Sequence, residues 1–362
     1  MSPVALLVSL LGLPTDRLSL STNTTEAQVL APDAAGANAD AGKVIIITPA
    51  GRRARLELLA HYVDAWMSAG VAHEWHLWEN TREASDRDYL YELAKAHSYV
   101  KVIEYNGAPG AKGHNAGIGF FWSDPPVREQ LLSATCVRFD DDVVWADSPE
   151  KFADFVKTVR DSAAEHPFVY ANVLNNAVST NFHQRYCGHF RALNWPWKGG
   201  TGYPATWDSK ERPDDLCTDE KAWKDGDYAV DLHREVLRVG PSELRCPDKR
   251  IELDYRYSIN AVGWHGPELR KYDDGGWALP GHNHPSAGPK KEGGGDVGEE
   301  EMLSVAIPRH LGKRNLWVGD FVVAHYSFTP QDEKVDAATD ILEGYRALAG
   351  CRQPKDLATP CV

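Results

Sequence analysis

The sequence predicts an α/β fold in which a mostly parallel sheet is flanked by helices on both faces. From residue 43 onward, short runs rich in β-branched residues alternate with segments of helical spacing, the pattern of successive βαβ units. The runs at 43–49 and 134–139 are apolar with little alternation in polarity, as in strands that are buried on both faces. Polar residues follow the ends of these runs, where open α/β sheets bind ligands.

The first half of the predicted sheet starts after residue 42. Residues 14–42 are rich in Ala, Ser, Thr, Asp and Gly, so we expect residues 1–42 to form an arm or linker with little order. The segment after the first strand carries Leu56, Leu59 and Val63 near helical spacing, which predicts a crossover helix. The strands predicted in this half are 43–49, 74–78, 99–105 and 134–139, with helices that begin at 51 and near 89.

The second half of the chain is less regular. Ser148 and Pro149 have the positions of an N-cap and a first-turn proline, so they predict a helix. Residues 175–250 mix Pro, Gly, Trp and His, which predicts a long irregular insertion, either a binding platform or a decorated surface loop. The glycine-rich run 273–298 is interpreted as a lid. The remaining predicted strands are 168–173, 256–264 and 321–328, and the remaining helices open at 298 and span 336–348.

Length and composition indicate a globular protein without a nucleic-acid footprint. The 362 residues are 43% hydrophobic and 25% charged, and the formal net charge is -13. A nucleic-acid-binding protein needs a basic surface, so we expect no nucleic-acid partner. The apolar stretch 4–13 is too short to span a bilayer and lacks the basic residues of a secretory signal. We therefore expect a soluble domain. Its location is either the cytoplasm or the Golgi or secretory lumen.

Six cysteines are present, none of them in a CxxC pair, which argues against a zinc ribbon or a thioredoxin-like motif. Cys136 lies inside a predicted buried strand and is interpreted as a core thiol. The even number permits disulfides, and Cys217–Cys246 and Cys351–Cys361 are the pairs to test first.

Three consecutive acids, Asp140, Asp141 and Asp142, follow the strand that ends at Phe139. Adjacent carboxylates repel one another, and a bound cation relieves that repulsion. Oxygen ligands of this type suit Mn²⁺ or Mg²⁺, and such ions often keep positions free for phosphate oxygens. The alternative is a solvated acidic turn.

Other candidate residues lie at strand ends and in a glycine-rich loop. Thr48 and Pro49 end the first strand, Arg52 follows it, and Glu79 lies at the end of the second. The loop 110–119 contains Lys112 and Asn115 among glycines, as expected where backbone approaches phosphate, although Lys112 is equally typical of a solvated loop. Two candidates lie near the C-terminus: the acids at 299–301, which open a helix and stabilise its dipole, and His325 on a strand.

Taken together, these motifs resemble the GT-A class of nucleotide-sugar-dependent glycosyltransferases over residues 43–330. The segment KGHNAG at 112–117 is similar to the one before the metal site in family-two-like enzymes. The segment FDDD at 139–142 looks like the DxD motif, and GEEEML at 298–303 is similar to the xED-xx-L motif of inverting members. His325 matches the histidine that often completes the metal shell, and residues 172–184 are similar to bacterial polysaccharide-type transferases.

This resemblance implies a Rossmann-like GT-A catalytic domain at 43–330, with a nucleotide-binding half at 43–145, an acceptor half at 146–330, and a C-terminal helix and tail at 331–362. It implies a donor that is a nucleoside-diphosphate sugar, with UDP-sugar favoured over GDP-sugar, and an acceptor that is a glycan or other hydroxyl compound. The implied metal is Mn²⁺ or Mg²⁺, held by Asp140, Asp142 and His325. Donor-binding positions are Thr48, Pro49, Arg52, Glu79, Lys112, Asn115, Asp140 and Asp141.

The resemblance also implies that Glu300 is the catalytic base of an inverting transfer in glycan or polysaccharide synthesis. The family's base is usually Asp and every candidate here is Glu, so Glu299 and Glu301 remain alternatives. Trp195, Trp197 or Trp264 would stack on sugar faces. Two other functions fit the same features: a sugar-phosphate nucleotidyltransferase, and a carbohydrate-binding protein without catalysis.

Overall fold

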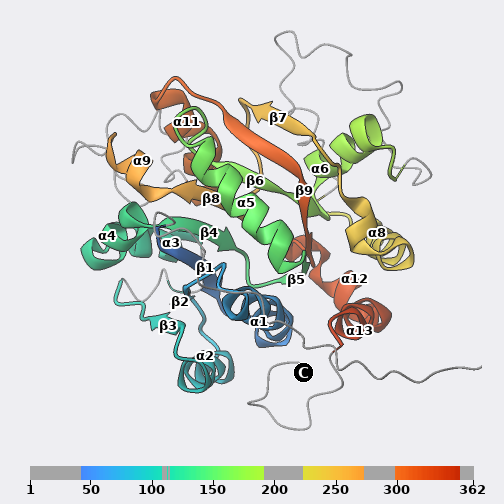
Figure 1. The fold of residues 1–362 in the computed structure, drawn as a ribbon. Helices are drawn as coiled ribbons and strands as arrows, with labels where there is room; N and C mark the ends of the chain where they lie inside the picture. Colours follow the sequence, from blue (N-terminus) through green and yellow to red (C-terminus); the bar gives the residue numbers. More distant parts are fainter. Residues whose placement is uncertain (1–41, 108–111, 113–114, 191–222, 273–297, 351–362) are drawn as a thin grey trace, which may run out of the picture. The chain divides into compact units, whose positions relative to one another are not determined.

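The computed structural model describes residues 42–107, 112, 115–190, 223–272 and 298–350, all of which belong to a unit that begins at Gly42. One sheet runs through this unit in the order β3-β2-β1-β4-β8-β6-β9-β5, and β7 also pairs with β9 (Figure 1). Its strands are β1 Val44–Ala50, β2 Glu74–Glu79, β3 Val100–Ile103, β4 Thr135–Phe139, β5 Val143–Ala146, β6 Val169–Leu174, β7 Arg250–Leu253, β8 Ala261–His265 and β9 Asn315–His325.

Most strands of this sheet point the same way. β1 is parallel to β2 and β4, β2 is parallel to β3, and β6 is parallel to β9. β8 is antiparallel to both β4 and β6 and so joins the two parallel groups, while β5 and β7 are antiparallel to β9. Six strands therefore share one direction and three oppose it, which confirms the prediction of an α/β fold with a mostly parallel sheet.

Helices cover both faces of the sheet, and α1 and α5 lie side by side on one of them (Figure 1). The α-helices are α1 Arg53–Ser68, α2 Ala84–Ala96, α3 Asn115–Ser123, α4 Pro125–Ser133, α5 Pro149–Asp161, α6 Ala177–Phe182, α8 Gly226–Val239, α9 Gly266–Arg270, α10 Glu299–Glu301, α11 Ile307–His310, α12 Asp332–Ala337 and α13 Thr339–Leu348. Shorter elements are the π-helices His183–Cys187 and Met302–Ala306 and the 3₁₀-helices Pro241–Leu244 and Thr329–Gln331.

The sheet separates two apolar cores, as its strand sequences require. Along β1, Val44 and Ile46 face the core formed with α1, α2, α5, α8 and α13. Ile45 and Ile47 face the second core, which contains side chains of α3, α4, α6, α9 and α11. Successive strand residues point to opposite faces, so an apolar run without alternation is what a doubly covered strand needs.

α5 shows how local sequence signals place one of these helices. The Ser148 hydroxyl accepts from the backbone N–H of Lys151, and Pro149 occupies the first helical position, so the predicted cap is confirmed. Phe152 then stacks on Trp66 of α1 with ring centroids 4.1 Å apart. This contact fixes α1 against the same face of the sheet.

Several predicted elements need correction. α8 lies inside the segment 175–250, for which we predicted irregular structure; Asp225 caps it, and its apolar side is buried. β8 starts at Ala261 rather than 256, and β9 starts at Asn315 rather than 321. The predicted C-terminal helix divides at Ala338 into α12 and α13.

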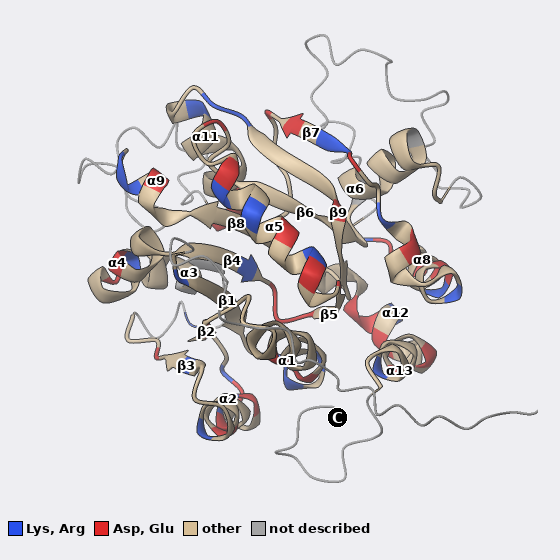
Figure 2. Cartoon of the chain, viewed as in Figure 1, with Lys and Arg blue, Asp and Glu red and all other residues tan. Residues whose placement is uncertain are grey.

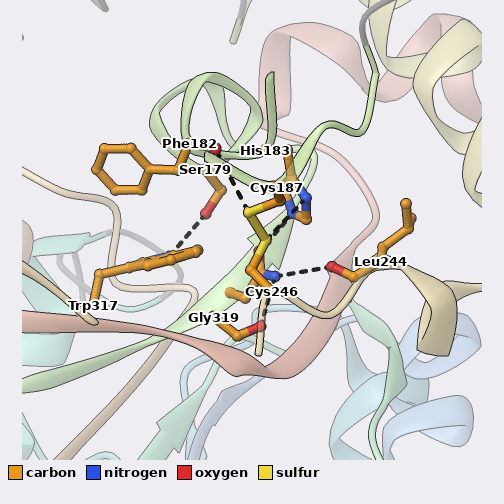
Figure 3. The surroundings of a disulfide bond; sticks show 9 residues. Ser179, Phe182, His183, Cys187, Leu244, Cys246, Trp317 and Gly319 are labelled. Carbon is orange, nitrogen blue, oxygen red and sulfur yellow. Dashed lines mark hydrogen bonds between the residues drawn. A yellow bond between two sulfur atoms is a disulfide. The ribbon is translucent and has the colours of Figure 1, made fainter. Parts of the chain in front are cut away.

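The cysteine prediction was wrong for Cys246, which is bonded to Cys187 and not to Cys217 (Figure 3). Cys136 is a buried free thiol on β4, as predicted. The arm up to residue 41, the glycine-rich run 273–297 and the Cys351–Cys361 pair lie outside the described residues. Among the helices that are described, none has the length and apolar character needed to cross a membrane.

Candidate functional site

A cavity of about 600 Å³ opens where β1 and β4 end. The carboxyl ends of parallel strands are the usual ligand sites of open α/β sheets. The β4–β5 connection carries acidic residues (Figure 2), and these residues line the cavity. The lining residues are Pro49, Ala50, Gly51, Arg52, Asn80, Thr81, Arg82, Glu83, Asp86, Ile118, Arg138, Asp140, Asp141, Asp142, Arg256, Ser258, Ile259, Asn260, Gly298, Glu299, Glu300, His325, Ser327, Phe328, Thr329 and Asp332.

Two carboxylates and one imidazole converge in this cavity. The ligand atoms of Asp140, Asp142 and His325 all lie within 4.8 Å of one another. His325 is the last residue of β9, and its Nε2 is 3.3 Å from Oδ2 of Asp142. Asp142 is fully buried; its Oδ2 is paired with His325 and Arg52, and its Oδ1 has no hydrogen-bond partner among the described residues. Buried polar atoms without partners are rare, so Oδ1 is the oxygen that is available to a ligand.

Arginines at the start of α1 neutralise part of this charge. The backbone N–H of Arg52 donates to Asp141 Oδ2 at 2.8 Å, and its Nε donates to Asp141 Oδ1 at 2.8 Å. Its Nη1 lies 3.0 Å from Asp142 Oδ2, while Nη1 of Arg55 is 3.8 Å from the same oxygen. Burial alone raises the pKa of Asp142, but Arg52, His325 and Arg55 outweigh it, so the pKa lies well below its usual range.

The carboxylate of Asp140 is held in one orientation by two neighbours. Nη1 of Arg138 donates to its Oδ1 at 2.8 Å, and Nδ2 of Asn260 donates to its Oδ2 at 2.7 Å. The Asp140 backbone N–H also donates to the carbonyl of Asn260 at 3.0 Å. These contacts come from β4 and from the residue before β8, so the antiparallel strand positions this acid.

The three glutamates of α10 have different environments. Glu299 is buried; its Oε2 pairs with Nη2 of Arg138 at 3.0 Å, and its Oε1 accepts from Trp122 Nε1 at 2.8 Å. Glu300 is half-buried on the cavity wall and forms an ion pair with Arg256. Burial raises the pKa of Glu300, and the charge of Arg256 opposes that shift. Glu301 is not among the lining residues.

The lining carries more negative than positive charge. It contains eight acids, Glu83, Asp86, Asp140, Asp141, Asp142, Glu299, Glu300 and Asp332, against four arginines, Arg52, Arg82, Arg138 and Arg256. This excess favours a cation inside the cavity. Two carboxylates and an imidazole form a donor set that Mn²⁺ accepts, so the residues present fit the metal expected from the sequence.

Not every residue that the sequence singled out reaches the cavity. Thr48 is fully buried and its hydroxyl accepts from Trp75 Nε1 at 3.0 Å. Lys112 donates to Glu79 Oε1 at 2.5 Å, and neither lines the cavity. Asn115 opens α3, and only its backbone is described.

The sugar-stacking interpretation of Trp264 was wrong, because this side chain is buried and donates to the Leu131 carbonyl at 3.3 Å. Trp195 and Trp197 lie outside the described residues.

Sequence reasoning missed three residues that shape the site: Arg55, Arg138 and Asn260. A signal was present for Arg138, because a charged side chain within an apolar strand must find a buried partner. Arg55 lies one helical turn after Arg52, so both face the aspartates from α1. Asn260 had no signal in the sequence, since its role follows from the pairing of β4 with β8.

Comparison with known protein families and with curated protein sequences finds no match to this chain.

Proposed function

We propose that this protein is a metal-dependent glycosyltransferase that moves a sugar from a nucleoside-diphosphate sugar to a hydroxyl acceptor. One observation carries the proposal: the Asp140, Asp142 and His325 group and the Glu300 carboxylate line the same cavity. A transfer of this kind needs a cation beside the departing diphosphate and a base beside the incoming hydroxyl. The motif resemblance noted above supports the same assignment, and the sheet is compatible with the GT-A fold that we infer.

In this proposal Asp140, Asp142 and His325 hold Mn²⁺ or Mg²⁺. When bound, the cation neutralises negative charge that develops on the diphosphate leaving group. Arg138 and Asn260 keep the Asp140 carboxylate in place through bonds of 2.8 and 2.7 Å. Arg52 keeps the Asp141 carboxylate turned toward the start of α1. Asp141 therefore fixes the position of the loop between β4 and β5.

Glu300 is the general base of the proposed reaction. Its carboxylate takes a proton from the acceptor hydroxyl as the hydroxyl oxygen attacks the anomeric carbon, which implies inversion at that carbon. Glu299 is the weaker candidate, because its two oxygens are already engaged with Arg138 and Trp122. The ion pair with Arg256 holds the Glu300 side chain at the cavity wall and restricts its rotamers.

A screen of UDP-sugars and GDP-sugars for Mn²⁺-dependent hydrolysis tests this function. We expect release of UDP from at least one sugar donor, and faster release when an acceptor glycan is added. Pyrophosphate formed from a nucleoside triphosphate and a sugar phosphate would instead establish a nucleotidyltransferase. Sugar binding without turnover of any donor, with Mn²⁺ present, would establish a binding protein.

A further inference from the structure

A second group of potential metal ligands lies away from the cavity, around the disulfide Cys187–Cys246 (Figure 3). None of its members lines the cavity described above. His183 is fully buried beside the two sulfurs, and one nitrogen of its ring and both sulfurs lie within 4.8 Å of one another. The proposed glycosyl transfer makes no use of this group.

Neighbouring backbone groups determine which nitrogen of His183 carries the hydrogen. The amide nitrogen of Asn172 donates to the carbonyls of Leu244 and Gly319 at 3.2 and 3.1 Å. Its amide oxygen therefore faces His183 Nε2, at 2.8 Å. An amide oxygen only accepts, so Nε2 carries the hydrogen and Nδ1 of the neutral ring has a free lone pair.

That lone pair points toward sulfur. Nδ1 of His183 is 3.6 Å from Cys246 Sγ. In a tetrahedral zinc site with Zn–S near 2.3 Å and Zn–N near 2.05 Å, an adjacent sulfur and nitrogen are also about 3.6 Å apart. Outer-sphere carbonyls and amides that orient a ligand imidazole are typical of metal sites, and Asn172 has that relationship to His183.

His189 lies near this group, but its side chain is not among the three whose ligand atoms lie within 4.8 Å of one another. The π-helix ends at Cys187, and Gly188 adopts a left-handed φ of 81° that turns the chain back. This turn brings the backbone N–H of His189 to within 3.2 Å of the His183 carbonyl, and the two imidazole rings are 5.6 Å apart between centroids. A change of the His189 side-chain rotamer would add a fourth ligand, and Cys₂His₂ is a common composition of structural zinc sites.

We propose that His183, Cys187 and Cys246, with His189 as fourth ligand, bind Zn²⁺ when the disulfide is reduced. A dithiol or phosphine reductant supplies two electrons, and with two protons the S–S bond becomes two thiols. Binding of Zn²⁺ then displaces both protons, because thiolates are the ligands. Removal of the metal and two-electron oxidation by a disulfide oxidant restore the S–S bond. The end of the π-helix thus stays tied to the segment after Leu244 in either redox state.

Cobalt absorption tests this site in the full chain. The protein is reduced with a phosphine without oxygen, freed of reductant and titrated with Co²⁺, in a background in which Cys217, Cys351 and Cys361 are serine and Asp142 is asparagine. We expect one Co²⁺ per chain with a thiolate-to-cobalt charge-transfer band, lost on addition of Zn²⁺. The oxidised protein should show no such band.

Cys187→Ser removes one of two thiolates at a half-buried position. It should halve the charge-transfer intensity per bound Co²⁺ and weaken binding by at least about 100-fold, more than loss of an outer-sphere partner does. His189→Gln, with both thiolates kept, should weaken binding and leave the charge-transfer intensity nearly unchanged. A reduced chain that gives no charge-transfer band, or a Cys187→Ser variant that gives the full band, would overturn the proposal and leave a purely structural disulfide.

Discussion

Asp142 and His325 face each other across 3.3 Å, one from the turn after β4 and the other from the end of β9. Both side chains are buried, and Asp142 is also paired with Arg52, the N-cap residue of α1, and with Arg55 inside α1. Removal of one buried member of such a group leaves the others without compensation. The consequences for metal binding, catalysis and stability can therefore be separated by substitution.

Asp142→Asn should abolish binding of Mn²⁺ in the cavity and with it any metal-dependent donor turnover. Asparagine keeps the size of the side chain but removes the charge that attracts the ion. Electron paramagnetic resonance of free Mn²⁺ measures the affinity directly, and we expect at least about a 100-fold weaker Kd because a direct ligand is lost. Asp154→Asn, an exposed position on α5, is the matched control. Retained Mn²⁺ binding in Asp142→Asn would place the ion elsewhere.

Glu300→Gln should lower kcat by about 100-fold or more, since loss of a general base typically costs that much. The amide preserves the shape of the side chain, so KM for the donor should change little. Steady-state rates at saturating donor and acceptor provide the measurement, with Glu301→Gln as the control because Glu301 does not line the cavity. Full activity of Glu300→Gln would assign the base to another residue.

Arg138→Met should lower the free energy of unfolding by about 3–5 kcal/mol, because Glu299 would remain buried without its partner. The double variant Arg138→Met/Glu299→Gln removes both charges and keeps an oxygen for Trp122, so part of that loss should be recovered; the remainder reflects the lost bonds from Arg138 to Asp140 and to the Ile259 carbonyl. Urea denaturation of the two single variants and the double variant gives the coupling energy. Additive effects of the two substitutions would contradict a coupled pair.

Glu74→Gln should destabilise the protein at neutral pH but not in strong acid. Burial raises the pKa of Glu74, but hydrogen bonds from Lys101, Lys43 and His76 outweigh it and lower the pKa from 4.5 to about 2. A depressed carboxyl pKa stabilises the fold above the unfolded-state pKa, and that contribution disappears as pH falls from 4.5 to 2.

Each unit of pKa shift corresponds to about 1.36 kcal/mol of stability. Because solvent screens ion pairs near the surface, we expect the free energy of unfolding of Glu74→Gln to be about 1–2 kcal/mol below that of the wild type at pH 7. The measurement is urea denaturation of wild type and variant at several pH values. A destabilisation of Glu74→Gln that is the same at pH 2 and pH 7 would contradict this account.

The sequence was most informative where one local rule decides the outcome. β1, β4 and the start of α5 follow from apolar runs and from the Ser148–Pro149 cap, which need no knowledge of distant neighbours. α8 also carried its signals, because Asp225 caps it and apolar residues recur at helical spacing. The Pro-, Gly- and Trp-rich residues before α8 carry no helical spacing, so the composition of 175–250 as a whole does not indicate the helix.

Other features depend on contacts that no local pattern encodes. Cys187 and Cys246 have a sequence separation of 59, and connectivity among six cysteines has many solutions. The roles of Asn260 and Arg55 arise only when β8 pairs with β4 and α1 packs above the aspartates. Asp140, Asp142, Glu300 and His325 were selected from motif types, and the structure brings them to one cavity although two of them lie far along the chain.

β9 has hydrogen-bonded neighbours in β5, β6 and β7 and ends at His325. A single inserted residue in β9 would swap its inward and outward side chains and misplace the imidazole at its tip. For the glycosyl transfer that we propose, the position of the metal-binding imidazole therefore depends on the exact length of β9.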